Sequence, residues 1–135
     1  AVSILVDFLR DEKVLIESKD TCIENQLYRP FYMHRTGHYI GYDVHDVGSY
    51  YDLTDTDSKT GKVHYSPRKF EAGMVCTVEP GLYFSPGLEA SRHFAGIGIR
   101  IEDDVLVTEN EPQILTVNIP RSVKEIEQFM KESRK

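Results

Sequence analysis

The most regular pattern in the chain lies between Gly96 and Thr108, which reads G-I-G-I-R-I-E-D-D-V-L-V-T. A period of two places successive side chains on opposite faces of a β-strand, so this pattern predicts one continuous strand. The apolar face would consist of Ile97, Ile99, Ile101, Val105 and Val107. The other face would consist of Gly98, Arg100, Glu102, Asp104 and Leu106. Glycines beside charged residues on a strand often mark the approach of a ligand, although charges on a strand can also simply face solvent.

Helical patterns flank the predicted strands. Residues 1–12 have the spacing of an amphipathic helix. A second helix is expected to begin within Ser18–Thr21 and to end before Pro30, and a closing amphipathic helix is expected to begin near Ser122. The order of helices, then strands, then a helix predicts an α+β fold, and 135 residues fit one domain.

The region between the helices contains one further clear strand. Residues 74–79 are mostly apolar and precede Pro80–Gly81, which is typical of a turn. Residues 51–68 are polar and rich in turn-forming residues, so we expect a mobile loop there.

Composition excludes several classes of function. A net charge of −6 leaves no basic surface for nucleic acid. No apolar run approaches 18 residues, so no membrane span is predicted. Two cysteines suit a reducing compartment, which indicates a cytoplasmic protein. The chain begins with Ala1 within a helical pattern, and we therefore expect a piece of a longer protein.

Imidazole and carboxylate groups are the notable chemical features. His34, His38 and His45 lie within twelve residues, and glutamates stand in the two predicted strands as Glu79 and Glu102. Such groups form hydrolytic divalent-metal sites. The sequence around His34 lacks the H-E-x-x-H pattern of a zinc helix. Each histidine alone could equally be a hydrogen-bonded core residue, so the residues by themselves leave the metal site as one of two interpretations.

Three segments carry a family resemblance. They read Y-R-P-F-Y-M-H-R-T-G-H-Y-I-G-Y-D-V-H-D-V-G, then F-E-A-G-M-V-C-T-V-E-P-G-L-Y, and finally G-I-G-I-R-I-E-D-D-V-L-V-T-E. In this order they resemble the C-terminal half of the catalytic domain of the Xaa-Pro aminopeptidases, members of the pita-bread metallopeptidase family. The resemblance runs from about Ile23 to Met130. It implies that residues 1–135 form half of a pita-bread fold, a curved and mostly antiparallel sheet with helices on its outer face.

The resemblance also implies a set of metal ligands. His38 and Glu79 would bind one divalent ion and Glu102 would bridge two, most often manganese in this branch. The family's site needs two further aspartates at a D-x(10)-D spacing, and they precede the histidines. Here the only pair at that spacing is Asp46 and Asp57, which follows them. The chain would therefore supply three of five ligands and be inactive alone.

Further roles follow from the same resemblance. The substrate would be a peptide with proline at its second position. Glu79 would also move a proton from water to the leaving nitrogen, His45 would stabilise the intermediate or carry protons, and His34 would contact the substrate near the prolyl residue. Arg100 and Tyr83 would orient the metal-binding carboxylates.

The expected partners are the missing N-terminal half of the same enzyme and, because half a fold exposes a sheet edge and apolar helix faces, a second copy of the chain. Other functions remain open. A prolidase, which cleaves Xaa-Pro dipeptides, is closely similar in this half. A pita-bread module without catalytic activity could bind other proteins, and a metal-free hydrolase of the creatinase type would not need both glutamates.

Overall fold

The computed structural model describes residues 1–133 and shows the expected α+β architecture. In chain order the elements are α1 Val2–Asp11, α2 Lys19–Glu24, β1 Tyr39–Ile40, β2 Tyr51–Thr56, β3 Val63–Pro67, β4 Val75–Val78, β5 Gly81–Tyr83, the 3₁₀ helix η1 Glu89–Phe94, β6 Gly98–Arg100, β7 Asp103–Leu106, β8 Gln113–Ile114 and α3 Val123–Glu132. No helix in residues 1–133 has the length and apolar character needed to cross a bilayer.

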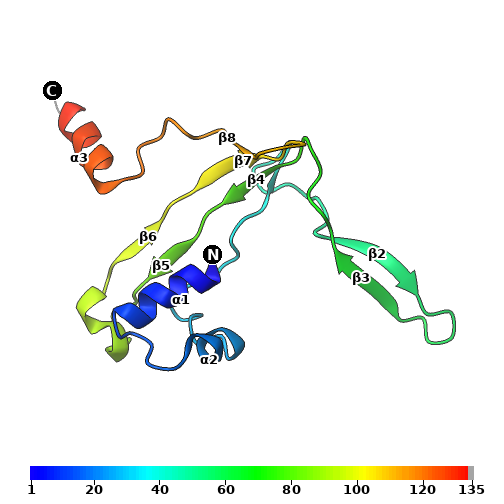
Figure 1. The fold of residues 1–135 in the computed structure, drawn as a ribbon, viewed down its shortest axis with the longest axis horizontal. Coiled ribbons are helices and arrows are strands. Elements are labelled where there is room, and N and C mark those ends of the chain that lie inside the picture. Colours follow the sequence, from blue (N-terminus) through cyan, green and yellow to red (C-terminus); the bar gives the residue numbers. More distant parts are fainter. Residues whose placement is uncertain (134–135) are drawn as a thin grey trace.

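The strands form a long antiparallel ribbon with an arm attached to it. One sheet has the order β1-β4-β7-β8, while β5 pairs with β6 and β2 pairs with β3. Figure 1 shows that β4 continues into β5 and that β6 continues into β7, so the first two sheets form one ribbon. The β2–β3 pair projects away from it.

The predicted single strand from Gly96 to Thr108 is interrupted in the structure. β6 ends at Arg100 and β7 begins at Asp103. The interruption lies opposite Pro80, which has no backbone N–H to donate to the ladder. The Pro80 carbonyl still accepts a long hydrogen bond of 3.3 Å from the Ile101 N–H. The sequence pattern predicts a turn at Pro80–Gly81. In the structure, these residues instead join β4 to β5.

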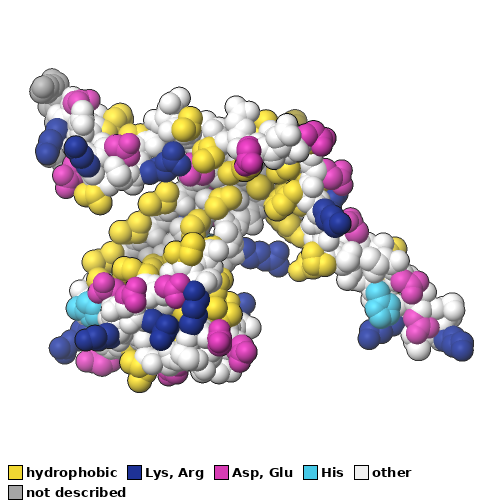
Figure 2. Space-filling model, in the orientation of Figure 1, with side chains coloured by type: hydrophobic (Ala, Val, Ile, Leu, Met, Phe, Trp, Pro, Cys, Tyr) yellow, Lys and Arg dark blue, Asp and Glu magenta, His cyan; other side chains and the backbone are white. Residues whose placement is uncertain are grey.

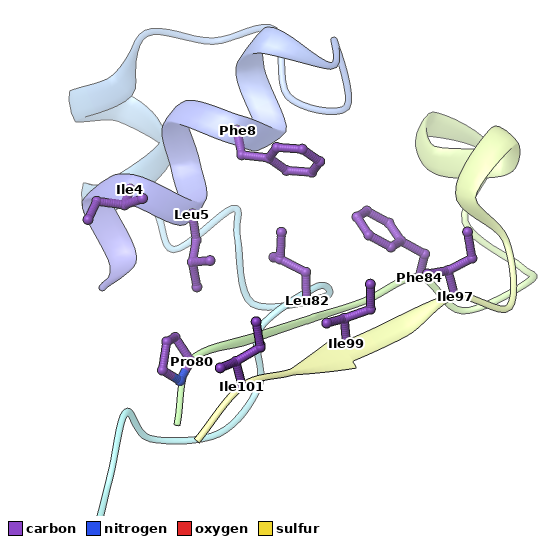
Figure 3. A pocket seen from close by; sticks show the side chains of 10 residues that line it. Ile4, Leu5, Phe8, Pro80, Leu82, Phe84, Ile97, Ile99 and Ile101 are labelled. Atoms are coloured by element: carbon purple, nitrogen blue, oxygen red, sulfur yellow. The ribbon is translucent and has the colours of Figure 1, made fainter. Parts of the chain in front are cut away.

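The apolar side chains on the two sides of this junction face different surroundings. Ile97, Ile99 and Ile101 line an apolar groove of about 410 Å³ beneath α1, together with Ile4 and Phe8 (Figure 3). Figure 2 shows hydrophobic side chains gathered over this part of the ribbon. Next to the groove lies the core, in which Leu9, Val14, Phe31 and Phe84 are buried.

The apolar residues of β7 and its end face a second cavity. Val105 and Val107 line this space of about 500 Å³ with Cys76. Burial raises the pKa of the Cys76 thiol, as expected for an unreactive core cysteine. Cys22 and Cys76 are both free thiols. The alternation predicted from the sequence is therefore correct, but the apolar residues before and after the interruption line two separate apolar spaces.

The segment predicted as a mobile loop is instead a β-hairpin. Leu53 pairs with Tyr65 and Thr56 with Val63 across β2 and β3. The turn is closed by Asp57, whose Oδ1 accepts hydrogen bonds from the Lys59 and Thr60 N–H groups. These cross-strand pairs and the side-chain-supported turn explain why a polar segment forms strands.

The remaining helix predictions differ in length. α2 has Ser18 as its N-cap and ends at Glu24, earlier than expected, because Gln26 takes a left-handed conformation with φ +54°. α3 begins at the predicted position with a capping box formed by Ser122 and Glu125. Its apolar residues are exposed: Val123, Ile126, Phe129 and Met130. This matches the apolar helix face expected of half a fold.

Candidate metal centre

A short loop before β1 lies directly against the end of β4. The Thr77 N–H donates to the His38 carbonyl at 2.9 Å, and the Glu79 N–H donates to the Thr36 carbonyl at 2.7 Å. Between these bonds, a Cβ added at Gly37 would lie 1.9 Å from the Thr77 carbonyl oxygen. Only glycine allows so close an approach of two backbones. The loop–β4 contact therefore holds His38 and Glu79 in one rigid unit.

The imidazole of His38 is oriented by its own backbone. Its Nδ1 lies 3.0 Å from the Tyr39 carbonyl oxygen, which can only accept a hydrogen bond. Nδ1 therefore carries a proton, and in the neutral ring Nε2 has the lone pair that can coordinate a metal. Nε2 lies 3.3 Å from Glu79 Oε1. A metal-binding histidine typically has this arrangement, with one nitrogen donating to a carbonyl and the other free to coordinate.

Glu79 is buried and held by several groups. The residue is 8% exposed, and its Oε1 accepts a hydrogen bond from the Thr77 hydroxyl at 2.9 Å. Its Oε2 lies 3.5 Å from Arg100 Nη1. A buried carboxylate requires such partners or a metal ion.

Glu102 lies opposite Glu79 across the ribbon. The pairs Val78–Asp103 on one side of the junction and Gly81–Arg100 on the other put Glu79 in register with Glu102. Like charges in such a pair destabilise a sheet unless a cation lies near both of them. Arg100 meets part of this need, because its Nη2 is 3.9 Å from Glu102 Oε2. Arg100 itself is half exposed.

The three predicted ligands converge. One ligand atom each from His38, Glu79 and Glu102 lies within 4.8 Å of the other two. One nitrogen and several carboxylate oxygens suit a hard or borderline divalent cation. Together with the free Nε2 of His38, this donor set fits the implied metal.

The two remaining ligands have no counterpart among the residues that the structure describes. The Asp46 carboxylate lies against Gly41, where a Cβ would meet it at 2.5 Å. Asp57 closes the hairpin turn, and the Lys59 and Thr60 N–H groups hold the pKa of its carboxyl below the usual range. Neither aspartate joins the cluster of His38, Glu79 and Glu102. Their spacing in the sequence therefore has no ligand role here.

A cavity of about 300 Å³ opens beside His38 and Glu79. Five of the seven residues predicted for the site line it: His34, His38, His45, Glu79 and Arg100. The rings of His38 and His45 lie 4.3 Å apart between centroids. His45 is exposed on the segment after β1, whereas His38 is mostly covered. The structure thus gathers all three histidines of the cluster at one opening.

Tyr83 contacts His34 rather than a carboxylate. His34 Nδ1 lies 2.8 Å from the Arg35 carbonyl and so carries a proton, while its Nε2 forms a hydrogen bond of 2.9 Å with the Tyr83 hydroxyl. This differs from the contact that the family resemblance implies for the phenol. Tyr83 therefore orients His34 in this structure, and its link to the metal ligands is indirect.

Sequence reasoning missed three residues of the site. Tyr50 and Arg35 line the cavity, and the Arg35 guanidinium lies 5.8 Å from the centre of the Tyr50 ring. Tyr50 also stacks on Tyr39, with centroids 4.8 Å apart. Thr77 contacts both His38 and Glu79. The position of Thr77 two residues before Glu79, on the same face of β4, was the only signal available.

Comparison with known proteins identifies Xaa-Pro aminopeptidases and a Xaa-Pro dipeptidase among the relatives of this chain. Xaa-Pro aminopeptidase from Haemophilus influenzae is 45% identical over 122 residues, covering 90% of this chain and 26% of that protein. Xaa-Pro aminopeptidase from Escherichia coli is 41% identical over 99% of this chain and 28% of its own length. Human Xaa-Pro dipeptidase is 36% identical over 87% of this chain. The chain thus spans little more than a quarter of the length of the first two relatives.

Solved structures agree with the sequence relatives. The solved structure of zinc-substituted E. coli aminopeptidase P in complex with product aligns with 99% of this chain over 28% of its own chain, with a TM-score of 0.82 and 40% identity. The ribbon and helices described above therefore have the pita-bread fold of that enzyme. A model of metallopeptidase family M24 matches residues 12–109. With the fold, the relatives and the family model in agreement, the chain belongs to metallopeptidase family M24.

Proposed function

We propose that residues 1–135 form the C-terminal part of the catalytic domain of a Xaa-Pro aminopeptidase, which removes the first residue from peptides with proline in second place. The observation that carries this proposal is the convergence of His38, Glu79 and Glu102 within 4.8 Å, with two glutamates opposite each other in one ribbon. The names of the relatives at 41–45% identity give the substrate class.

The cofactor in this proposal is a pair of divalent ions, manganese by family resemblance, held on this chain by His38, Glu79 and Glu102. Carboxylate-rich sites suit Mn²⁺, although a relative has also been solved with zinc in its site. Bound there, the ions would polarise the scissile carbonyl and make a water molecule more acidic. Two further carboxylates would come from a part of the protein outside this chain.

The chain's own residues divide the remaining work. Glu79 would carry a proton from the attacking water to the nitrogen that leaves. Its carboxylate is suited to this, because Thr77 and Arg100 hold it without blocking the cavity. His45 lies exposed at the opening and could donate to the developing negative charge. His34, held by Tyr83, would contact the substrate near its proline.

The proposal includes an assembly and a compartment. The exposed apolar face of α3 and the groove beneath α1 favour association with the N-terminal half of the same enzyme, and with a second copy of the protein. The two free cysteines, one buried and one partly buried, fit a cytoplasmic location.

The test is a cleavage assay on the full-length protein loaded with Mn²⁺. A tripeptide Xaa-Pro-Xaa should lose its first residue, a matched Xaa-Ala-Xaa tripeptide should not, and chelation should abolish the reaction. The 135-residue chain alone with Mn²⁺ should be inactive. A Xaa-Pro dipeptide is assayed in parallel, and cleavage of this dipeptide alone would identify a dipeptidase instead. Cleavage of neither the Xaa-Pro-Xaa tripeptide nor the Xaa-Pro dipeptide would contradict the proposed function.

A further inference from the structure

Thr77 lies between two of the candidate ligands. Its side chain is buried on β4, with the residue only 4% exposed. The Thr77 Oγ1 accepts a hydrogen bond from the His38 N–H at 2.9 Å and lies 2.9 Å from Glu79 Oε1. One hydroxyl therefore links a backbone group of the histidine with the carboxylate of the glutamate.

The direction of these bonds is determined by the groups involved. A hydroxyl has one proton to donate, and an ionised carboxylate can only accept. Since the His38 N–H is a donor, the Thr77 proton must point to Glu79 Oε1. The hydroxyl thus fixes the rotation of the Glu79 carboxylate, and leaves Oε2 on the side of Arg100 and Glu102.

The identity of the residue adds a second constraint. Threonine is branched at Cβ, which restricts χ1 on a strand. The backbone on both sides is also held, because the Thr77 N–H donates to the His38 carbonyl and the Gly37 backbone lies against the Thr77 carbonyl. A hydroxyl in this place has little freedom, so its position is transmitted to both ligands.

We infer that Thr77 is a positioning residue of the metal centre, which sets the orientation of Glu79 relative to His38 before a metal binds. Hydrogen-bond partners behind metal ligands commonly change metal affinity 10–100-fold when they are removed. The inference rests on the proposed function for the identity of the metal, and on the contacts within this chain for everything else.

The experiment compares Thr77→Val with Thr77→Ser in the full-length protein. Thr77→Val keeps the shape and removes the hydroxyl, so affinity for Mn²⁺ by titration calorimetry should fall about 10–100-fold. kcat for a Xaa-Pro-Xaa peptide should fall as well. Thr77→Ser keeps the hydroxyl with a freer χ1, and both quantities should return most of the way to wild type.

The matched control is Thr108→Val. The Thr108 hydroxyl also accepts from a backbone N–H and donates to an oxygen, here Asn110 and the Glu111 carbonyl. Because its hydrogen bonds are exposed, this variant should lose less thermal stability than Thr77→Val, and it should keep wild-type Mn²⁺ affinity. If it weakens Mn²⁺ binding as much as Thr77→Val, a general loss of stability explains both results and the inference is wrong.

Two other outcomes separate the proposals. Wild-type Mn²⁺ affinity in Thr77→Val overturns the role of Thr77 and leaves the proposed function intact. Absence of Mn²⁺ binding by the wild-type protein overturns both. Should Thr77→Val fail to fold, Thr77→Ala is compared with Thr77→Ser by the same titration, and equal affinities in that pair contradict the inference.

Discussion

The two glutamates of the metal centre occupy contrasting surroundings. The Glu79 side chain is 11% exposed and lies against the loop before β1, where Thr77, His38 and Arg100 all contact it. The Glu102 side chain is 39% exposed, and its ion contact with Arg100 is 3.9 Å long. One carboxylate is thus oriented by the chain, whereas the other is held loosely at the interruption between β6 and β7.

The contrast shows how a sheet can hold two like charges opposite each other. Glu79 is stabilised by hydrogen bonds within its own side of the ribbon, so its position does not depend on Glu102. Glu102 has freedom to adjust to a ligand. A site with one rigid and one adaptable carboxylate can receive a cation without moving β4.

Exchanging each glutamate for glutamine is the most direct way to break the comparison. In the full-length protein, both Glu79→Gln and Glu102→Gln should lower peptidase activity by about a hundredfold or more, because each removes a metal-binding charge. Their effects on metal-free stability should differ. Glu79→Gln should cost about 1–3 kcal/mol because it disturbs buried charged hydrogen bonds, whereas Glu102→Gln should stay within about 0.5 kcal/mol.

Activity assays and denaturant unfolding of the chelated protein measure the two effects separately. Equal stability losses in the two variants would show that Glu79 is no better held than Glu102. Full activity in either variant would remove that residue from the metal site.

The surroundings of Glu79 can also be disturbed through the contact between the loop before β1 and β4. Gly37→Ala would place a Cβ 1.9 Å from the Thr77 carbonyl oxygen, so the loop must move away from β4. We expect a stability loss of about 1–3 kcal/mol, as for other overpacked sites, together with weaker metal binding.

Gly87→Ala provides the matched control. A Cβ at Gly87 has no atom within 4 Å, so this exchange should change neither stability nor metal affinity. Thermal unfolding and Mn²⁺ titration of both variants check the prediction. Normal metal affinity in a destabilised Gly37→Ala protein would mean that the loop–β4 contact supports the fold but not the site.

The sequence predicts the chemistry of this site better than its geometry. Histidines and glutamates are conspicuous by type and place, and the family resemblance implied His38, Glu79 and Glu102 as the ligands among them. Thr77 could not be named in advance, because a threonine on a strand is ordinary and its role depends on contacts 39 residues apart in the sequence, with His38. The partner of the Tyr83 hydroxyl, which is His34 in this structure, was not foreseen either, since it depends on which of several groups lies within reach.

The fold shows the same division. Period-two alternation correctly identified the faces of residues 96–108, but it carries no information on the partner strand. The interruption arises from Pro80 on that partner, and could be foreseen only once the register was known. The hairpin at residues 51–68 was missed for a related reason: its strands are exposed on both faces, so no apolar alternation marks them.

Asp103, the residue next to Glu102, is held by two short side-chain hydrogen bonds. Asp103 Oδ1 accepts from the Thr116 hydroxyl at 2.7 Å, and Oδ2 accepts from Arg121 Nη1 at 2.6 Å. The Thr116 hydrogen bond, and then Arg121, hold the pKa of this carboxyl below its usual range. These contacts connect β7 to the segment that leads into α3, so they limit how far Glu102 can move.

Replacing Asp103 should give the smallest loss of stability among these variants, and this loss should depend on pH. Because the folded pKa of Asp103 lies below the unfolded value of about 3.9, its stabilisation is complete above that pH and is lost as the pH falls through the folded pKa. Asp103→Asn should therefore cost less than about 1 kcal/mol at pH 6, and the difference from wild type should shrink toward pH 3. Thermal unfolding across this range measures it. Thr116→Val removes the hydrogen bond that lowers the pKa of Asp103 most. Its stability difference from wild type should therefore vary with pH in nearly the same way as that of Asp103→Asn. A constant difference from pH 6 to pH 3 would show that the ionised form of Asp103 does not contribute this stability.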